Sequence, residues 1–330
     1  MDHLDPTLTH WINHQLADLH GSTDYQLEPL KVEASHREFY RITLADRDAA
    51  TMVAMSSPPA LENNQQFEAM AKVFTRFGVG VPQILAVEPA AGFYLMTDLG
   101  SVHLEDLYDT PQADSALQLA IDELIKIQAV SDVAVPAYTA QRFHDELDIF
   151  RQWFIEAWLQ QTFPNGDLQE SFTGLVENSQ TQEQVCVHRD FHCRNLLVVD
   201  HRLGVVDFQD ALMGPVAYDL ASLLRDCYHR FNEADIARWR ARYLECTPLA
   251  LDPAKFAADV DLIAAQRQLK AVGIFARLQL RDGKTSHLGY IPPVLSHIES
   301  IANRYPQLRA LTAQLPAWRS AASNRLAEQR

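Results

Sequence analysis

Residues Val187–Asp210 read V-H-R-D-F-H-C-R-N-L-L-V-V-D-H-R-L-G-V-V-D-F-Q-D, and this stretch carries the most specific pattern in the chain. Asp190 is followed five positions later by Asn195, and Asp207 closes an apolar run. Phosphoryl transfer uses such a set, because one carboxylate can accept the proton of the attacking hydroxyl while other oxygen groups bind the metal that bridges the phosphates. The stretch predicts Asp190 as the catalytic base, Asn195 and Asp207 as Mg²⁺ ligands, and ATP as the co-substrate.

Two apolar runs inside this stretch predict a hairpin. Leu196–Val199 and Leu203–Val206 are joined by the polar residues 200–202, and a hairpin of this kind would present the three candidate groups together. The alternative is a charged surface turn followed by a solvated strand end. Because that alternative needs the three residues and the hairpin to coincide by chance, we favour the catalytic interpretation.

Composition limits the classes of protein that the chain can represent. With 330 residues and 47% hydrophobic content it can bury a sizeable core, either as one two-lobed enzyme or as two small domains. A net charge of −15 argues against a nucleic-acid binder, which needs a basic surface. The chain has no apolar run of about 18 residues and no signal-peptide pattern at its start, so we expect no membrane partner and a cytoplasmic location. The four cysteines form no C-x-x-C pair, and nothing in the sequence indicates an oligomeric state.

The chain changes character along its length. Short strand-like segments occupy the first hundred residues: Tyr25–Val32, Glu38–Leu44, Thr51–Met55, Gln83–Glu88 and Phe93–Met96. One helix is expected at Ala60–Phe77, with Phe67, Met70 and Phe74 on one face and Gly78 as its stop signal. From Leu117 onward the apolar spacing is mainly helical.

This order predicts an α+β fold with a small antiparallel-sheet lobe containing one helix, followed by a larger, mainly helical lobe. We expect residues 1–97 to bind the nucleotide and residues 98–330 to carry the catalytic and acceptor groups, with the nucleotide between the lobes. The connection at residues 96–100, and in particular Met96 and Asp98, would contact the nucleotide.

The segments H188-R-D-F-H-C-R-N195, D207-F-Q-D210 and G214-P-V-A-Y-D-L220 resemble the aminoglycoside phosphotransferase and choline kinase superfamily. That resemblance implies a protein-kinase-like two-lobe fold. With K270-A-V-G-I-F-A-R-L-Q-L-R-D-G-K284 added, the chain is similar over most of its length to the bacterial family of anomeric N-acetylmuramate and N-acetylglucosamine kinases. The narrower resemblance implies formation of sugar 1-phosphates that feed UDP-sugar synthesis in peptidoglycan recycling.

The resemblance also implies roles for single residues. It matches Asp190 to the base, Asn195 and Asp207 to the metal ligands, and Asp219 to a buried aspartate that orients the catalytic segment through hydrogen bonds. His188 is expected to support the same loop. For Asp219 a helix N-cap or a surface charge in an acidic first turn is the alternative.

One kinase feature is missing from the expected third strand. That strand reads T51-M-V-A-M and has no lysine to hold the ATP phosphates, and the loop at residues 32–41 is not glycine-rich. Ser35 and Arg37 are therefore candidate nucleotide contacts, and Lys31 and Arg41 are further candidates for the missing cation.

Candidate acceptor contacts follow from the chemistry of the sugar. N-acetylmuramate carries a lactyl carboxylate that an arginine can pair with, and Arg194 and Arg225 lie near the motifs that resemble the family, as do Arg277 and Arg281. His192 either contacts the sugar or a phosphate oxygen, or stabilises the loop. Two other functions stay open: a kinase of cationic aminoglycosides, and a catalytically inactive nucleotide-binding module.

Overall fold

The computed structural model describes residues 5–21, 23–30, 36–45, 51–132, 135–164 and 166–328. The chain forms two compact units. Unit 1 contains residues 1–119 and 195–210, and unit 2 contains residues 120–194 and 211–330. The expected division at residue 97 concerns function and stays a prediction, whereas the compact units place the predicted hairpin with the N-terminal part of the chain.

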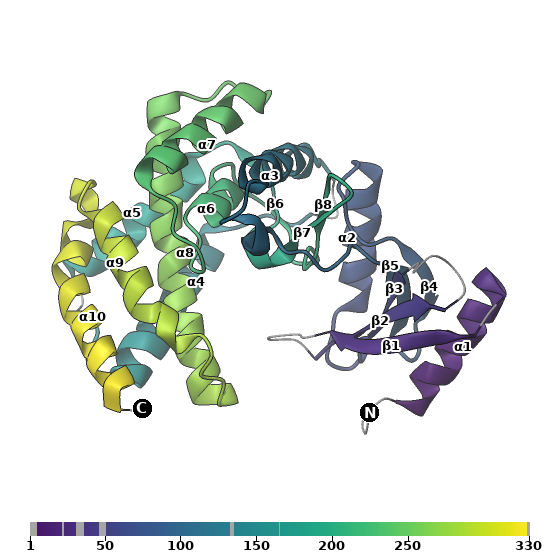
Figure 1. The fold of residues 1–330 in the computed structure, drawn as a ribbon. Coiled ribbons are helices and arrows are strands. Elements are labelled where there is room, and N and C mark those ends of the chain that lie inside the picture. The colour runs from purple at the N-terminus through teal and green to yellow at the C-terminus, as the bar shows by residue number, and fades with distance from the viewer. Residues whose placement is uncertain are drawn as a thin grey trace. The chain divides into compact units, whose positions relative to one another are not determined.

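Unit 1 is built on a five-stranded antiparallel sheet with the order β1-β2-β3-β5-β4 (Figure 1). Its strands are β1 (Tyr25–Leu30), β2 (Glu38–Leu44), β3 (Thr51–Ser56), β4 (Ile84–Glu88) and β5 (Phe93–Thr97). All five predicted strands are therefore present, with boundaries within two residues of those expected.

Helices cover both faces of this sheet. Phe93 and Leu95 of β5 pack in one core with α1 (Pro6–His20), whereas Tyr94 between them contacts Phe67 of α2 (Asn64–Arg76). Successive strand side chains point to opposite faces, so β5 is buried on both sides.

The helix α1 is an addition to the one helix expected in this part of the chain. Its start is marked by Asp5, which accepts a hydrogen bond from the Thr7 N–H at 2.8 Å, and its end by Gly21 in the left-handed conformation. The buried residues Leu8, Ile12 and Leu16 recur every fourth position, so its sequence carried an amphipathic signal.

The predicted hairpin is present in unit 1 as β7 (Leu196–Val199) and β8 (Arg202–Val205), with Leu196 opposite Val205. Asp200 and His201 form its turn with φ values of 48° and 59°. Two consecutive positive φ angles are typical of the tight turns whose twist matches that of a two-stranded ribbon.

Unit 2 is mainly helical, as expected. It holds the end of α3 (Ala113–Gln128), followed by α4 (Ala140–Ile149), the π-helix η2 (Phe150–Trp158), α5 (Asp167–Thr181), α6 (Tyr218–Leu224), α7 (Glu233–Cys246), α8 (Pro253–Asp282), α9 (Ile291–Ala302) and α10 (Arg309–Glu328). Its two strands, β6 (Gln184–Val187) and β9 (Leu212–Pro215), pair antiparallel. Of the short 3₁₀ turns in the described residues, η4 (Leu288–Tyr290) and η5 (Pro306–Leu308) belong to unit 2 and η1 (Leu104–Leu107) to unit 1, while η3 (Cys193–Asn195) lies where the chain passes from unit 2 to unit 1.

The 30-residue helix α8 organises unit 2, since it contacts α4, η2, α5, α6, α7 and α9 (Figure 1). None of the described helices is both long and apolar enough to cross a membrane.

Candidate active site

The loop that carries Asp190 follows β6 and is held by a buried carboxyl group. Asp219, in the first turn of α6, is fully buried and accepts hydrogen bonds from the backbone N–H groups of His188 at 2.6 Å and Arg189 at 3.0 Å. Burial raises the pKa of Asp219 to about 7, although both N–H groups act in the opposite direction. The Asp190 N–H in turn meets the His188 ring at 3.3 Å. These contacts are of the supporting kind expected for His188 and Asp219, and their importance for catalysis stays a prediction.

A buried ion network lies next to this loop. Glu146 of α4 pairs with Arg189 at 2.8 Å and with Lys270 of α8 at 2.9 Å, and it also accepts the hydroxyl of Tyr138. Burial raises the pKa of Glu146, but Lys270 and Arg189 outweigh this effect and lower it to about 2. An ionised Glu146 therefore binds two cations that belong to different elements.

These cations set the charge state of Asp190. Burial by itself raises the pKa of Asp190, but the charge of Lys270, followed by His192, Arg267 and Arg189, lowers it from 3.8 to about 2. Arg267 of α8 also donates to the Arg189 carbonyl at 3.0 Å. Asp190 is therefore an ionised acceptor at neutral pH, held in a loop of defined shape.

Sequence reasoning assigned no role to Glu146, Arg267 or Lys270. Lys270 is the first residue of one of the segments that resemble the family, but nothing in that segment indicates that its side chain pairs with Glu146. Glu146 belongs to no motif, and nothing in the local sequence distinguishes it from a surface glutamate.

The second half of the loop leads into an aromatic cluster in unit 2. The Arg194 guanidinium lies 3.7 Å from the centre of the Tyr228 ring and donates to the Tyr290 hydroxyl at 3.1 Å. The rings of His192 and Tyr228 are nearly perpendicular, with centres 5.5 Å apart. The structure therefore groups the two loop residues expected to contact the acceptor with two tyrosines that sequence reasoning missed.

Asp226 fixes the backbone beneath this cluster. Its buried carboxylate accepts the N–H of Cys193 at 3.3 Å and the N–H of Tyr228 at 3.1 Å. Asp226 thus ties the loop of Asp190 to the segment after α6, much as Asp219 does for the first half of that loop.

Arg225 does not have the position expected of a sugar contact. Its side chain is fully buried and pairs with Asp261 at 2.7 Å and with Glu233 at 2.8 Å. A guanidinium with no accessible surface and two carboxylate partners stabilises the helices around it, and contact of Arg225 with the substrate stays a prediction.

The two candidate metal ligands lie at one end of the β7–β8 hairpin in unit 1. The Val206 N–H donates to the Asn195 carbonyl at 3.0 Å, which links the residue before Asp207 to the other ligand. Asp207 has φ 63°, and its carboxylate accepts the Gln209 amide at 2.6 Å. Phe208 anchors this turn by stacking on Phe67 of α2, with ring centres 5.3 Å apart.

These residues fit a magnesium ion. The amide of Asn195 and the carboxylate of Asp207 are hard oxygen donors, and no cluster of three or more His, Cys, Asp or Glu side chains occurs in the described parts of the chain that could hold an ion alone. Mg²⁺ is commonly bound by one or two protein oxygens while waters and substrate phosphates complete its shell.

The connection after β5 is clamped by an arginine. Arg41 of β2 donates to the Asp98 carboxylate at 2.6 Å and 3.2 Å, and to the Gly100 carbonyl at 2.7 Å. Gly100 has φ 85° and donates its own N–H to Asp98 at 2.9 Å. Arg41 therefore binds the connection, and its contact with the phosphates stays a prediction. Met96 is buried in β5, and its contact with nucleotide stays a prediction, as does that of Asp98.

Of the other phosphate candidates, Arg37 is described and Lys31 and Ser35 lie outside the described residues. Arg37 is buried, donates to the Ser57 hydroxyl at 3.2 Å and lies 3.5 Å from Glu62. Its role in nucleotide binding stays a prediction.

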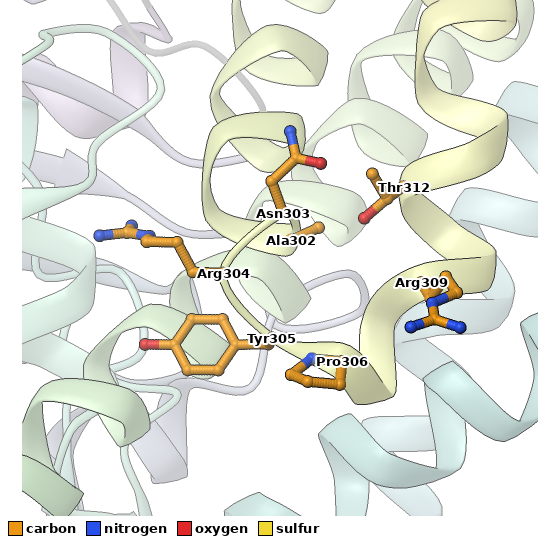
Figure 2. Close-up of a pocket in the computed structure, with 7 residues that line it drawn as sticks. All are labelled: Ala302, Asn303, Arg304, Tyr305, Pro306, Arg309 and Thr312. Carbon is orange, nitrogen blue, oxygen red and sulfur yellow. The ribbon is translucent and has the colours of Figure 1, made fainter.

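A surface pocket of about 250 Å³ lies where α9 turns into α10 (Figure 2). Arg304 at this pocket pairs with Glu233 and Asp261, at 3.1 and 3.2 Å. The lining contains none of the candidate site residues that the structure describes: Ala302, Asn303, Arg304, Tyr305, Pro306, Arg309 and Thr312. We assign this pocket no part in the reaction.

Comparisons with known proteins agree with this chemistry. The profile of the phosphotransferase enzyme family matches residues 26–257. The chain is 33% identical over 319 residues to the N-acetylmuramate/N-acetylglucosamine kinase of Pseudomonas putida, covering 92% of this chain and 93% of that protein. The protein of the same name from Neisseria meningitidis is 34% identical over 313 residues, covering 91% and 92%.

Solved structures are similar in fold. The choline/ethanolamine kinase family protein of Mesorhizobium loti matches with a TM-score of 0.63 at 16% identity, over 95% of this chain and 99% of that one. Plasmodium vivax ethanolamine kinase matches with a TM-score of 0.65 at 10% identity, over 90% of each chain. These matches confirm the predicted α+β, protein-kinase-like fold. The chain belongs to the phosphotransferase enzyme family and is a kinase that transfers a phosphoryl group to a hydroxyl acceptor.

Proposed function

We propose that this protein is an ATP-dependent kinase that phosphorylates the anomeric C1 hydroxyl of N-acetylmuramate and N-acetylglucosamine. The sugar 1-phosphates would feed UDP-sugar synthesis in peptidoglycan recycling, in the cytoplasm. The observation that carries the substrate is the identity of about one third to curated kinases of these two sugars, over more than nine tenths of the chain.

The local geometry supports Asp190 as the group that receives the proton. The anomeric oxygen would form a bond to the γ-phosphorus while the bond from that phosphorus to the β–γ bridging oxygen breaks and ADP leaves. The hydroxyl proton passes to a carboxylate oxygen of Asp190. Because the pKa of Asp190 is about 2, it is a weak base that orients the hydroxyl and takes its proton late. An anomeric hydroxyl suits such a base because it is more acidic than an ordinary alcohol.

Magnesium fits the other candidate residues. We propose that Asn195 and Asp207 hold Mg²⁺, which when bound neutralises charge that develops on the phosphate oxygens. The hydrogen bond from the Val206 N–H to the Asn195 carbonyl keeps the two ligand segments in register.

The charges near Asp190 disfavour a cationic acceptor. Arg189, Arg267 and Lys270 lie close enough to lower its pKa, and a positively charged aminoglycoside would be repelled by the same groups. A neutral or anionic sugar meets no such repulsion.

The test is a phosphorus-NMR assay with Mg-ATP and, separately, N-acetylmuramate, N-acetylglucosamine and kanamycin. We expect a phosphate resonance coupled to the anomeric proton with both sugars. Asp190→Asn should lower kcat by about 10²-fold or more, since proton transfer is lost. Asp200→Asn is the matched control, because it makes the same chemical change at an exposed hairpin turn.

Each other outcome selects another function. A phosphate on a different sugar hydroxyl would refute the anomeric assignment. Product with kanamycin alone would identify an antibiotic kinase, and measurable ATP binding without phosphate transfer to any acceptor would identify an inactive module.

A further inference from the structure

Helix α8 carries four basic side chains along one side. Arg267, Lys270, Arg277 and Arg281 fall within a sector of about 80° when each residue advances the helix by about 100°. Leu269, Val272 and Ala276, on the far side of the same helix, are fully buried. Exposure increases along this row, from Lys270, whose side chain is 12% exposed, through the partly buried Arg277 to Arg281, whose side chain is 57% exposed.

Three of the four basic residues have partners. Lys270 pairs with Glu146 at 2.9 Å, Arg267 donates to the Arg189 carbonyl at 3.0 Å, and Arg281 pairs with Asp282 at 2.8 Å. The first two also lie near Asp190, whose ionised state depends on them. The row therefore starts at the base and runs along α8 away from it.

Arg277 differs from its neighbours in the row. It is partly buried, and among the described residues its guanidinium forms neither a hydrogen bond nor an ion pair. Arg267, whose Nε atom is enclosed in the same way, donates through its Nη2 atom to the Arg189 carbonyl. Burial, with repulsion from Arg281, lowers its pKa. Enclosing part of a guanidinium without an anion costs free energy, so the arrangement suits an anion supplied by a ligand.

The spacing along α8 relates this arginine to the base. Arg277 follows Lys270 by seven residues, which corresponds to a rise of about 10 Å along the helix. N-acetylmuramate carries its lactyl ether on C3, two ring atoms from C1, and the length of the ether side chain separates its carboxylate from the C1 hydroxyl. A sugar with C1 at Asp190 would extend its carboxylate along this face.

We infer that Arg277 binds the lactyl carboxylate of N-acetylmuramate and so sets the preference between the two sugars. This assignment rests on the proposed function, since it requires the sugar to react at Asp190. N-acetylglucosamine has a hydroxyl in place of the ether. It has no carboxylate to pair with the guanidinium, so Arg277 adds nothing to its binding.

The test compares kcat/KM for the two sugars in wild type, Arg277→Met and Arg281→Met. Methionine keeps an unbranched apolar stem and removes the charge. We expect Arg277→Met to lower the ratio of N-acetylmuramate to N-acetylglucosamine by about tenfold or more, the range of a charge-assisted hydrogen bond. Arg281→Met removes the next charge in the row, already paired with Asp282, and should change the ratio by less than about twofold.

A neutral analogue separates charge from shape. The methyl ester of N-acetylmuramate keeps the side chain but loses the negative charge, so wild type should prefer the acid over the ester. Arg277→Met should show little of this preference, and Arg277→Lys should restore part of it.

The remaining outcomes overturn the inference. An unchanged sugar ratio would remove Arg277 from specificity, and an equal loss with both sugars would make it a structural residue. A raised KM for ATP with both sugars would assign its anion to the nucleotide. If wild type phosphorylates neither sugar, the proposed function itself fails.

Discussion

At the residue scale, arginines in this protein differ in what they pair with, and the pairing decides their availability to a ligand. Arg41 is bound to Asp98 and Gly100, and Arg225 is enclosed by Asp261 and Glu233. Arg189 belongs to the loop of Asp190, and its side chain pairs with Glu146. Arg277 forms no ion pair among the described residues, and its Nε atom is enclosed without a hydrogen-bond partner.

Lys270 controls the charge of Asp190, and removing it should alter the pH dependence. Lys270→Met takes away the largest cationic contribution while the burial that raises the pKa of Asp190 remains, so that pKa should rise from about 2 by about one unit or more. The low-pH decline of kcat should move upward by the same amount. The measurement is kcat against pH at saturating substrates.

Lys126→Met is the control for this change. Lys126 is about half exposed and pairs with Glu123 on α3. The Lys126→Met substitution should therefore leave the dependence of kcat on pH unchanged. An acid limb that stays in place in Lys270→Met would show that Lys270 serves Glu146 alone.

At the element scale, the close crossing of α8 over η2 depends on one residue without a side chain. A Cβ atom on Gly273 would lie 2.6 Å from the Phe150 nitrogen and 2.7 Å from the Ile149 carbonyl oxygen. These are backbone atoms, which cannot rotate aside. The crossing places α8, and with it Lys270 and Arg267, against the segment that follows α4.

Gly273→Ala should therefore destabilise the protein, although alanine is the better helix former. Overpacking of this kind costs about 1–3 kcal/mol, more than the gain in helix propensity. Urea unfolding measures the free energy of unfolding of Gly273→Ala, with Gly174→Ala in α5 as the comparison.

Gly174 provides the contrast because a Cβ atom there meets nothing within 4 Å. Alanine at that position should raise the free energy of unfolding by about 0.5–1 kcal/mol. Equal stability of the two alanine variants would mean that the crossing is looser than described.

At the scale of the whole molecule, the candidate groups are divided between the two compact units. Unit 1 carries Asn195, Asp207 and the connection clamped by Arg41, while unit 2 carries Asp190 and the cations around it. The chain passes from unit 2 to unit 1 after Arg194 and returns after Asp210. The proposed metal ligands and nucleotide contacts thus fall in one unit, and the proposed proton acceptor falls in the other.

This division predicts which variants lose stabilisation by ligand. Mg-ATP at about one hundred times its Kd should stabilise wild type by about 2.7 kcal/mol, since it binds the folded chain alone. Asp207→Ala should lose most of that gain, and chelation with EDTA should have the same effect on wild type. Thermal unfolding with and without Mg-ATP measures it.

Asp190→Asn is the contrasting variant in this experiment. Because Asp190 is assigned to the acceptor hydroxyl, its variant should retain the stabilisation by Mg-ATP. Stabilisation lost in Asp190→Asn and kept in Asp207→Ala would reverse the two roles.

The sequence by itself determined the sheet, the helix over its second face, the hairpin and the family. These features depend on local periodicity and on motifs in which Asp190, Asn195 and Asp207 occur at set spacings, so neighbouring residues carry the information. The sequence of α1 also carried local helix signals, with Asp5 before its first turn and Gly21 after its last, but only one helix, α2, was expected in this part of the chain.

Only the tertiary structure decided what surrounds those motifs. Glu146 lies 44 residues before Asp190 in the chain and Lys270 lies 80 residues after it, so no local pattern relates them. Nothing in the sequence distinguishes Arg225 from Arg277. In the folded chain Arg225 is buried against a carboxylate from a distant part of the sequence, whereas the Nε atom of Arg277 has no hydrogen-bond partner. Charge and burial act through space, and the pKa of Asp190 therefore depends on contacts that exist after the chain has folded.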